Sequence, residues 1–421
     1  MVSARGCRYS RNEVATRSLQ VGSGESATPA ESVEFVSSWV ATTVPPLVDL
    51  HASVRNGPPS DPSGRPAHCV VFFMRYAFFM QSHLHKRLND RASPKPKRVR
   101  ALVRLLRRMR LRLLLLRARS SGRRSAVCVV LHRVDAPASP PGTRLDPALA
   151  PAAFRRQLRG LARHFKLVHA SMLCSAAAER RRGGRIPVAL TFDDDLGSHL
   201  DVVAPILLDA GVPASFFLTG ATLHAPFCFW WQRFDRALER GLALDDPRLP
   251  AIDGTKPLGA RWTEVDAMGD AIRRLAPSRR DEVADALLEV AGPDPPDAGL
   301  RADQVEKLAR AGFEIGFHTR RHDSLTRLDD EALRRAMRDG RQELERVVGR
   351  PLTAIAYPHG DADDRVARFA ADAGFAAGFT TAATAIAADG DAFRQARIDA
   401  VRLPWPDLGF ALVRMWLRAP R

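Results

Sequence analysis

The chain has 421 residues, of which 45% are hydrophobic and 26% are charged, so it can form one large domain or several smaller ones with a sizeable core. Its formal net charge is +17, but residues 86–124 hold 16 Lys or Arg and one acid, which leaves about +2 elsewhere. The positive charge is therefore local, and it does not mark the whole chain as a nucleic-acid-binding protein.

The cysteines and the apolar runs argue against disulfide-rich, zinc-thiolate and membrane-spanning proteins. Five cysteines lie far apart without a CxxC pair, which argues against a disulfide framework and against a thiolate zinc site. No uninterrupted apolar run reaches about 18 residues, and the N-terminus lacks the apolar segment of a secretory signal. We therefore expect a protein that is cytoplasmic or peripherally associated with a membrane, without a transmembrane helix.

Residues 1–124 are predicted to be an N-terminal extension of the folded domain. Gly, Ser and Pro recur in residues 1–85 without a sustained period, which is typical of disorder. Leucines and arginines recur at helical spacing in residues 98–119, which suggests a basic amphipathic helix in peripheral contact with an anionic membrane. An Arg-rich linker, or translated upstream DNA before a start at Met109, is the alternative. No aromatic residues interleave with the arginines, so we expect no nucleic-acid partner.

Apolar strands and amphipathic helices alternate from residue 125 to the C-terminus. This alternation is typical of parallel βα units, and six or seven such strands form either a barrel or an open doubly wound sheet. No G-x-G-x-x-G follows a strand, which argues against a dinucleotide-binding fold. Strands are predicted at 126–134, 187–192, 213–220, 313–319, 353–358 and 376–381, and helices at 149–165, 199–211, 302–312, 329–349 and 364–374.

An insertion interrupts the alternation at about residues 221–300. It is too long for a simple loop, and its apolar pattern predicts a small helical unit beside the mouth of the sheet. Trp230 and Trp231 either form a stacking wall for a sugar or pack within the insertion.

Three predicted strands end in residues that carry chemistry. The strand "VALTF" is followed by Asp193, Asp194 and Asp195; another ends in "HTRRH", with His318 and His322 four residues apart; the next ends in "YPHG". The carboxyl ends of parallel strands are where such folds build active sites. Two imidazoles and one carboxylate hold a divalent metal while leaving positions open for water and substrate.

A divalent cation would also explain why aspartates follow one another. Its charge offsets their mutual repulsion, and it acidifies water that it binds. One aspartate then binds the ion while its neighbour takes a proton from the water. Asp195 has a simpler alternative role, because it could cap the helix that begins near Ser198.

The motifs "TFDD", "HTRRH" and "AYPHG", in that order, resemble the polysaccharide deacetylases of carbohydrate esterase family 4, the chitooligosaccharide deacetylase homology domain. The resemblance covers about residues 126–404 and includes the first strand "VVLHRV". It implies a distorted (β/α) barrel of about seven parallel strands and a divalent metal, most commonly Zn²⁺. It also implies hydrolysis of N-acetyl groups on amino sugars, so an N-acetylated glycan is the expected partner.

The resemblance assigns roles to residues of this chain. Asp193 resembles the catalytic base, and Thr319 would orient the loop that binds the metal. The backbone N–H of His359 would help to bind the oxyanion. The expected metal ligands are Asp194, His318 and His322, and the expected substrate-binding residues are Tyr357, Pro358 and Gly360. Trp230 and Trp231 are added to the expected substrate-binding residues from the sequence of the insertion and not from the resemblance.

The chain also departs from the family pattern. Asp195 replaces the glycine that usually follows the aspartate pair, and Ala356 replaces the arginine that would tune Asp193. Neither the family's Asp-Trp motif nor its C-terminal Leu-x-His is evident; "FRQARI" and "VRLP" occupy that region. The general acid is therefore open among the imidazoles of His359, His199 and His132, and we expect His359 because it lies in a site motif.

The sequence thus predicts a metal-dependent hydrolase that removes N-acetyl groups from an amino-sugar glycan, either a polysaccharide or a lipid-linked sugar. One alternative is a catalytically impaired, carbohydrate-binding member of the fold, which the missing acid and arginine would fit. Another is a hydrolase of non-peptide C–N bonds in a non-sugar substrate, because one fold can host several activities.

Overall fold

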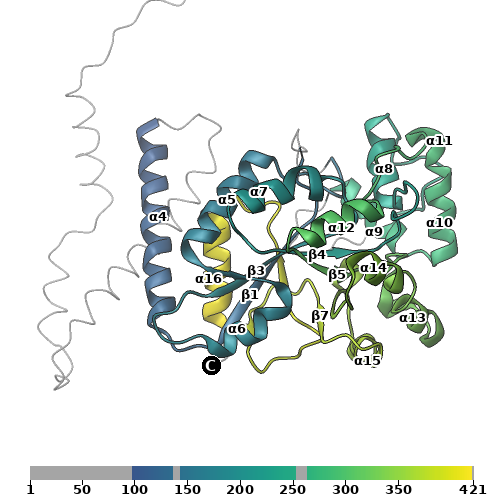
Figure 1. Ribbon diagram of the computed structural model, residues 1–421. Coiled ribbons are helices and arrows are strands. Elements are labelled where there is room, and N and C mark those ends of the chain that lie inside the picture. The colour runs from purple at the N-terminus through teal and green to yellow at the C-terminus, as the bar shows by residue number, and fades with distance from the viewer. Residues whose placement is uncertain (1–96, 136–142, 253–262, 420–421) are drawn as a thin grey trace, which may run out of the picture. The chain divides into compact units, whose positions relative to one another are not determined.

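Seven parallel strands form a nearly closed barrel (Figure 1). The computed structural model describes residues 97–135, 143–252 and 263–419. The strands follow one another around the barrel in the order β9-β1-β3-β4-β5-β6-β7. They are β1 (Ser125–Leu131), β3 (Pro187–Asp193), β4 (Ser215–Leu218), β5 (Glu314–Phe317), β6 (Ala354–Ala356), β7 (Ala377–Phe379) and β9 (Arg397–Asp399). Two short strands flank them, β2 (Lys166–Val168) beside β3 and β8 (Ile386–Ala387) beside β1.

The segment before β9 brings the two ends of the sheet together. β9 pairs in parallel with β1, and Gln395 forms a parallel bridge to Phe379 of β7. The Gln395 N–H donates to the Gly378 carbonyl at 2.8 Å, and the Thr380 N–H donates to the Gln395 carbonyl at 2.8 Å. The predicted barrel is therefore confirmed, and the alternative of an open doubly wound sheet is wrong.

Helices cover the outside of the barrel, as expected for strands that read as continuous apolar runs. All seven residues of β1 and all seven of β3 are buried. The helices outside the insertion are α4 (Lys97–Ser120), α5 (Pro151–His164), α6 (Leu173–Glu179), α7 (Ala204–Asp209), α12 (Ala302–Arg310), α13 (Asp330–Ala336), α14 (Arg341–Val348), α15 (Asp364–Asp372) and α16 (Asp407–Arg418). Short helical turns are η1 (Ala170–Met172), η2 (His199–Val203), η3 (Leu325–Arg327) and η4 (Pro358–Gly360).

One predicted helix is divided in the structure. The sequence predicts a single helix over residues 329–349, but α13 and α14 are separated at Gly340, whose φ is +82°. This left-handed conformation suits glycine and cannot continue a right-handed helix, so the chain turns there.

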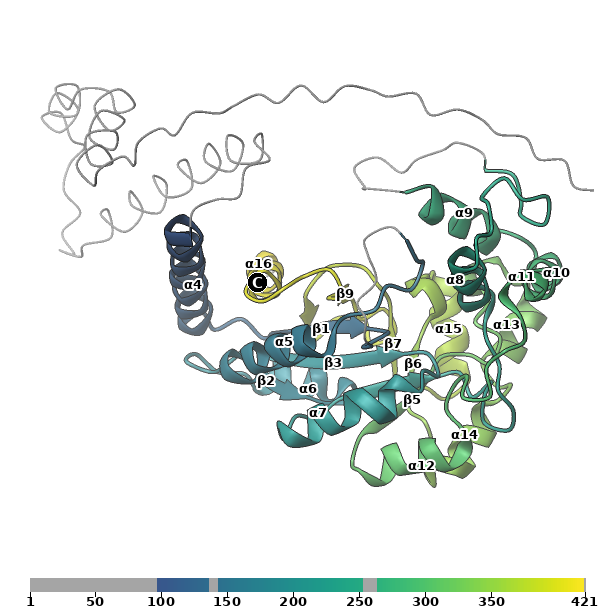
Figure 2. The same cartoon turned by 90° about the horizontal axis from the view of Figure 1, so that it is seen from above.

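The insertion forms a helical unit with an apolar core of its own. It contains α8 (Trp230–Glu239), α9 (Glu264–Arg273), α10 (Pro277–Ala286) and α11 (Leu288–Ala291), which lie together beside the barrel (Figure 2). Phe234, Ile272 and Leu287 are fully buried in this core, which is separate from the main hydrophobic cluster. The helical insertion is therefore confirmed as part of the fold.

Helix α4 packs on the domain, although the sequence analysis assigned its residues to the extension. Leu111, Leu115 and Ala118 are buried in the main hydrophobic cluster. Leu111 approaches α16 at Gly409, where a Cβ would lie 3.0 Å from the leucine side chain. Residues 1–85, for which disorder is predicted, lie outside the described residues.

No helix in the described part of the chain combines the length and apolar character that crossing a bilayer requires.

Candidate active site

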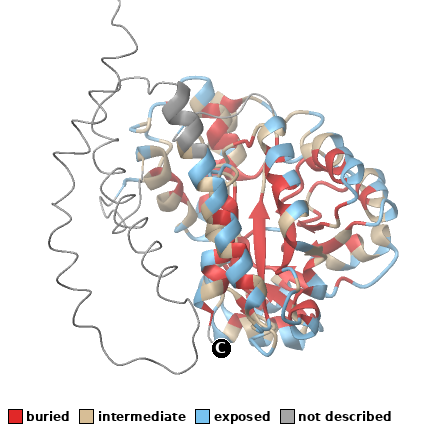
Figure 3. Cartoon of the chain, turned by 90° about the vertical axis from the view of Figure 1, so that its left-hand side faces the viewer, coloured by how far each residue is buried: buried red, intermediate tan, exposed pale blue. Residues whose placement is uncertain are grey.

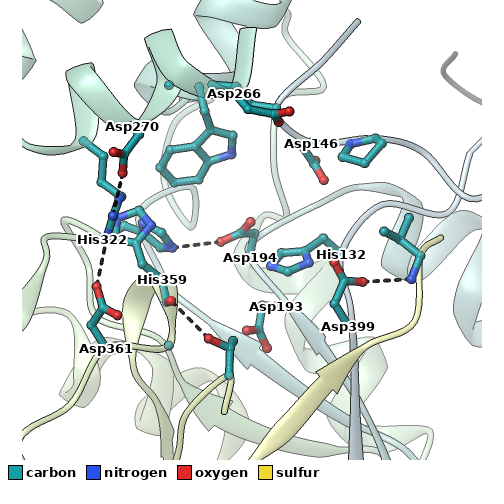
Figure 4. Close-up of a pocket in the computed structure, with 18 of the residues that line it drawn as sticks. His132, Asp146, Asp193, Asp194, Asp266, Asp270, His322, His359, Asp361 and Asp399 are labelled. Carbon is teal, nitrogen blue, oxygen red and sulfur yellow. Dashed lines mark hydrogen bonds and ion pairs between the residues drawn. The ribbon is translucent and has the colours of Figure 1, made fainter. Parts of the chain in front are cut away.

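A pocket of about 640 Å³ opens at the carboxyl ends of the strands (Figure 4). Its barrel wall includes residues of β3 and β9 and residues that follow β1, β3, β5 and β6, and its insert wall includes residues of α8 and α9. The barrel wall contains His132, Asp193, Asp194, His318, His322, His359, Gly360, Arg397 and Asp399. The insert wall contains Trp230, Trp231, Asp266, Gly269, Asp270 and Arg273.

Asp194, His318 and His322 converge on one point in the barrel wall. The Asp194 Oδ1 atom lies 3.7 Å from His318 Nε2 and 3.6 Å from His322 Nε2. The two Nε2 atoms lie 3.2 Å apart. In a tetrahedral zinc site with bonds of about 2.1 Å, ligand atoms are about 3.4 Å apart. The triangle therefore has the dimensions that a small divalent cation requires.

The chemical state of these side chains also fits a cation. Burial, reinforced by the neighbouring carboxylates of Asp146, Asp193 and Asp195, raises the pKa of Asp194 to about 8. Its Oδ1 atom is buried without a hydrogen-bond partner among the described residues. Since a buried carboxylate without a partner is unfavourable, a cation at this point would supply the missing countercharge.

The surroundings of His318 and His322 keep both imidazoles neutral, which is the form that binds a metal. Burial lowers the pKa of His318, and burial together with the imidazoles of His359 and His318 lowers the pKa of His322 well below its ordinary value. The His318 Nδ1 atom lies 2.7 Å from the Ala356 carbonyl oxygen, which leaves Nε2 facing the convergence point. Such a second contact fixes the tautomer and orientation of a metal-binding imidazole.

Backbone strain is concentrated at this site. Among the described residues, four non-glycine residues have a positive φ: Asp194 (73°), Thr319 (55°), His322 (50°) and His359 (59°). This conformation is costly for residues with a Cβ and persists where the surrounding structure enforces it, often at functional sites. At Asp194 it breaks the alternation of β3, so neighbouring aspartates serve different partners.

Asp193 is held by an arginine that the sequence analysis did not identify. Arg397 of β9 donates from Nη1 to Oδ1 at 2.7 Å and from Nη2 to Oδ2 at 2.8 Å. Burial alone would raise the pKa of Asp193, but the charge and hydrogen bonds of Arg397 outweigh it and lower the pKa to about 2. Arg397 therefore takes the place of the arginine that is missing at Ala356.

Asp195, which follows β3, forms hydrogen bonds with the loop after β4 and does not cap a helix. Its carboxylate accepts hydrogen bonds from the Thr219 N–H at 2.7 Å, the Thr219 hydroxyl at 2.6 Å and the Thr222 hydroxyl at 3.2 Å. The helical turn that follows has Ser198 at its N-cap and no side-chain cap bond. The predicted capping role is therefore wrong, because the loop after β4 supplies closer donors.

His132, at the end of β1, lies in the pocket among carboxylates (Figure 4). Burial alone would lower its pKa, but the charges of Asp194, Asp193, Asp146 and Asp399 together raise it. This environment favours an imidazolium that can give up a proton.

The other two candidate imidazoles have different surroundings. The His359 ring packs edge to face on His322 at 4.6 Å, and burial, with the charge of Arg273, lowers its pKa to about 3. His199 is fully buried between Phe192 and Phe216, and burial lowers its pKa to about 4. Its Nε2 atom lies 3.2 Å from the carbonyl oxygen of His132, so His199 supports the backbone beside the pocket.

Two tryptophans of the insertion both pack in its core and line the pocket. Trp230 and Trp231 line the pocket and are also buried in the core of the insertion. The Trp231 ring lies 4.4 Å from the His322 ring and stacks on Phe229 at 4.6 Å. The core-packing alternative is therefore confirmed, and the stacking of these rings on a sugar stays a prediction.

Only some residues of the turn after β6 line the pocket. His359 and Gly360 line the pocket, whereas Tyr357 is fully buried in the main hydrophobic cluster. Pro358 is buried as well, and neither Tyr357 nor Pro358 is among the lining residues. Of the four residues of "YPHG", only the last two thus face the space where a substrate would lie.

Arg397 and Asp399 were not predicted as site residues, and the reason is physical. They lie on β9, a strand of three residues that is too short to show an apolar period. Arg397 is 204 positions from its partner Asp193. The only local signal is the segment "FRQARI" after the last predicted strand, and its two arginines and one glutamine do not single out Arg397.

Comparisons with known proteins agree with the resemblance seen in the motifs. A family model described as Polysaccharide deacetylase matches residues 276–378, which include both histidines and the turn after β6. No curated protein matches the chain.

Solved structures of deacetylases share limited similarity with the chain. The Streptococcus pyogenes deacetylase PplD in complex with acetate is 18% identical, with a TM-score of 0.46 over 68% of this chain and 98% of that one. IcaB from Ammonifex degensii is 16% identical, with a TM-score of 0.42 over 70% and 98% of the two chains.

Proposed function

We propose that the chain is a metal-dependent hydrolase that removes N-acetyl groups from an amino-sugar glycan, because residues 276–378 match the family model described as Polysaccharide deacetylase. The convergence of Asp194, His318 and His322 beside the Arg397-bound carboxylate of Asp193 is the observation that carries this proposal. The chain is an enzyme of the deacetylase class, and its metal dependence and glycan substrate are the parts that we propose.

Asp194, His318 and His322 would hold the divalent metal, for which Zn²⁺ is our expectation from the ligand set. When bound, such an ion supplies Lewis-acid polarisation of the acetamide carbonyl and acidifies the attacking water. Two neutral imidazoles and one carboxylate leave further coordination positions open, as a catalytic site requires.

Asp193 is assigned as the base that takes a proton from the attacking water. Its bidentate pair with Arg397 keeps the carboxylate ionised and fixes its orientation at the end of β3. The water oxygen then bonds to the acetyl carbon, and the His359 backbone N–H is the proposed donor to the developing oxyanion.

His132 is assigned as the acid that protonates the departing amine. It borders the pocket together with Asp193 and Asp194, and the surrounding carboxylates favour its charged form. When the C–N bond breaks, the nitrogen takes the proton of His132 and leaves as the free amine, while the acetyl group leaves as acetate. This assignment replaces our expectation that His359 supplies the proton.

The pocket shape supports a sugar substrate. The indole rings of Trp230 and Trp231 and the acidic side chains of Asp266 and Asp270 border the same space. Aromatic faces and hydrogen-bonding carboxylates are suited to the apolar and hydroxyl faces of a sugar ring. The binding-only alternative is less favoured, because Arg397 holds Asp193 in place of the missing arginine and His132 borders the pocket as a candidate acid.

The proposal is tested by acetate release from N-acetylglucosamine oligomers, peptidoglycan, chitin and a lipid-linked N-acetyl sugar. The full chain should release acetate from at least one of them, lose this activity after chelation and regain it with added Zn²⁺. Release of acetate from simple non-sugar amides alone would favour the non-sugar alternative. Metal binding without acetate release from any amide would favour a binding protein and contradict the proposal.

A further inference from the structure

Helix α4 carries an apolar stripe on the surface of the protein, on the side that Figure 3 turns toward the viewer. Each of the large apolar side chains in this stripe is between 49% and 60% exposed. Nine large hydrophobic residues are exposed among the described residues, and five of them form this stripe. The stripe consists of Leu105, Leu106, Met109, Leu113 and Leu116.

The stripe is not the face that packs on the domain. Leu111, Leu115 and Ala118 are the buried residues of α4, and at about 100° per residue they lie on the opposite side of the helix from the stripe. The packed face is fixed by α16, where Arg107 pairs with Asp407 at 3.4 Å. The helix thus has two apolar faces, of which the fold uses only one, and such exposed patches mark interaction sites.

Arginines border the stripe on both sides. Arg108 and Arg112 are exposed along one edge, and Arg117 is exposed on the other. The 24 residues of α4 include ten Lys or Arg and no acid. An apolar strip between rows of cations is the arrangement of helices that lie in the interface of an anionic bilayer.

We propose that this stripe docks the protein onto an anionic lipid surface, with Leu113 and Leu116 in the acyl boundary and the flanking arginines at the headgroups. A second copy of the chain is a poorer occupant, because α4 has no acid to offset arginines brought face to face. Residues 1–94 hold ten Lys or Arg and seven acids, so they do not complement its charge either.

Vesicle co-sedimentation of the full chain tests the proposal, with vesicles of phosphatidylglycerol and phosphatidylcholine or of phosphatidylcholine alone. The wild type should bind the anionic vesicles, and the Leu113→Gln/Leu116→Gln variant should bind them about tenfold more weakly or worse. Arg108→Gln/Arg112→Gln should weaken binding by about fivefold for each arginine, and salt should reduce this difference.

A matched control is Met172→Gln/Leu208→Gln, which changes two side chains that are 51% and 53% exposed outside α4. This control should bind vesicles as the wild type does, and all variants should keep the wild-type circular dichroism. Absence of wild-type binding, or equal loss in the control, would overturn the proposal. So would a stripe variant that keeps its vesicle binding but changes from dimer to monomer in light scattering. Vesicle binding is measured without catalysis, so failure of this proposal would leave the proposed hydrolase activity untouched.

Discussion

The barrel wall and the insert wall of the pocket differ in charge and in strain. The barrel wall holds ionisable groups whose pKa values are shifted in both directions, and three of the four positive-φ non-glycine residues of the described chain, Asp194, His322 and His359, lie on it. The insert wall contains aromatic rings from an apolar core together with Asp266, Asp270 and Arg273 of α9, where Asp266 belongs to the helix cap and Asp270 pairs with Arg273. This contrast indicates that the barrel provides the chemistry and the insertion provides the shape of the pocket.

The largest expected effect is that of Asp193→Asn on the barrel wall. Because the amide cannot accept the proton of water, kcat should fall by about 1,000-fold, whereas metal binding should persist. Steady-state acetate release and metal analysis of the same preparation measure both. A matched control is Asp361→Asn at the edge of the pocket, which should retain most of kcat. Full activity of Asp193→Asn would show that this carboxylate is not the base.

The Arg397→Met variant should lose about 3–5 kcal/mol of unfolding free energy, because it leaves a buried carboxylate without its partner. Arg273→Met on the insert wall should lose about 1 kcal/mol at most, since its pairs with Asp270 and Asp361 are partly exposed. Denaturant unfolding of both variants measures the difference. Equal losses would remove the distinction between the two walls.

The pH dependence of the Arg397 effect has a definite sign. The wild-type pKa of Asp193 is about 2, below the ordinary value of about 3.9. The pair therefore stabilises the fold above about pH 4, and this contribution is lost as the pH falls toward about 2. In Arg397→Met, burial raises the pKa of Asp193, so the deficit relative to the wild type should shrink on acidification. A deficit that grows on acidification would contradict the pairing.

His132→Asn should lower kcat by about 100-fold for N-acetyl sugars, because the amine must leave without a proton donor. The defect should be much smaller for an aryl acetate, whose leaving group needs no protonation. Comparing kcat for the two substrates separates the loss of a proton donor from a general loss of structure. Equal defects on both substrates would assign His132 a structural role.

Trp231→Phe on the insert wall should have the smallest effect, about tenfold weaker metal affinity with little change in fold stability. The ring of Trp231 packs on His322, whose Nδ1 atom has no hydrogen-bond partner among the described residues. Aromatic packing therefore orients this imidazole. Phe227→Leu, which changes a ring packed on Phe229, is the control and should leave metal affinity unchanged.

Much of the barrel and three of its site residues could be predicted because their signals are local. Long apolar runs predict β1 and β3, and residues that directly follow strands predict Asp194, His318 and His322. The closing strand β9 could not be predicted, because it is short and its partners are distant in sequence.

Two other features of the chain depend on tertiary contacts. The carboxylate of Asp195 is bound by the loop after β4, and nothing in the local sequence reveals this partner. The amphipathic pattern of α4 indicates a helix but does not tell which of its two apolar faces packs on α16.

Calorimetric titration of the metal-free chain with Zn²⁺ tests the central claim most directly, because it does not depend on knowing the glycan. The wild type should bind about one ion per chain, and Asp194→Asn, His318→Asn and His322→Asn should each weaken binding by about 100-fold or more. Asp193→Asn should bind nearly as the wild type does. Wild-type affinity in any of the three ligand variants would contradict the claim that these side chains share one cation.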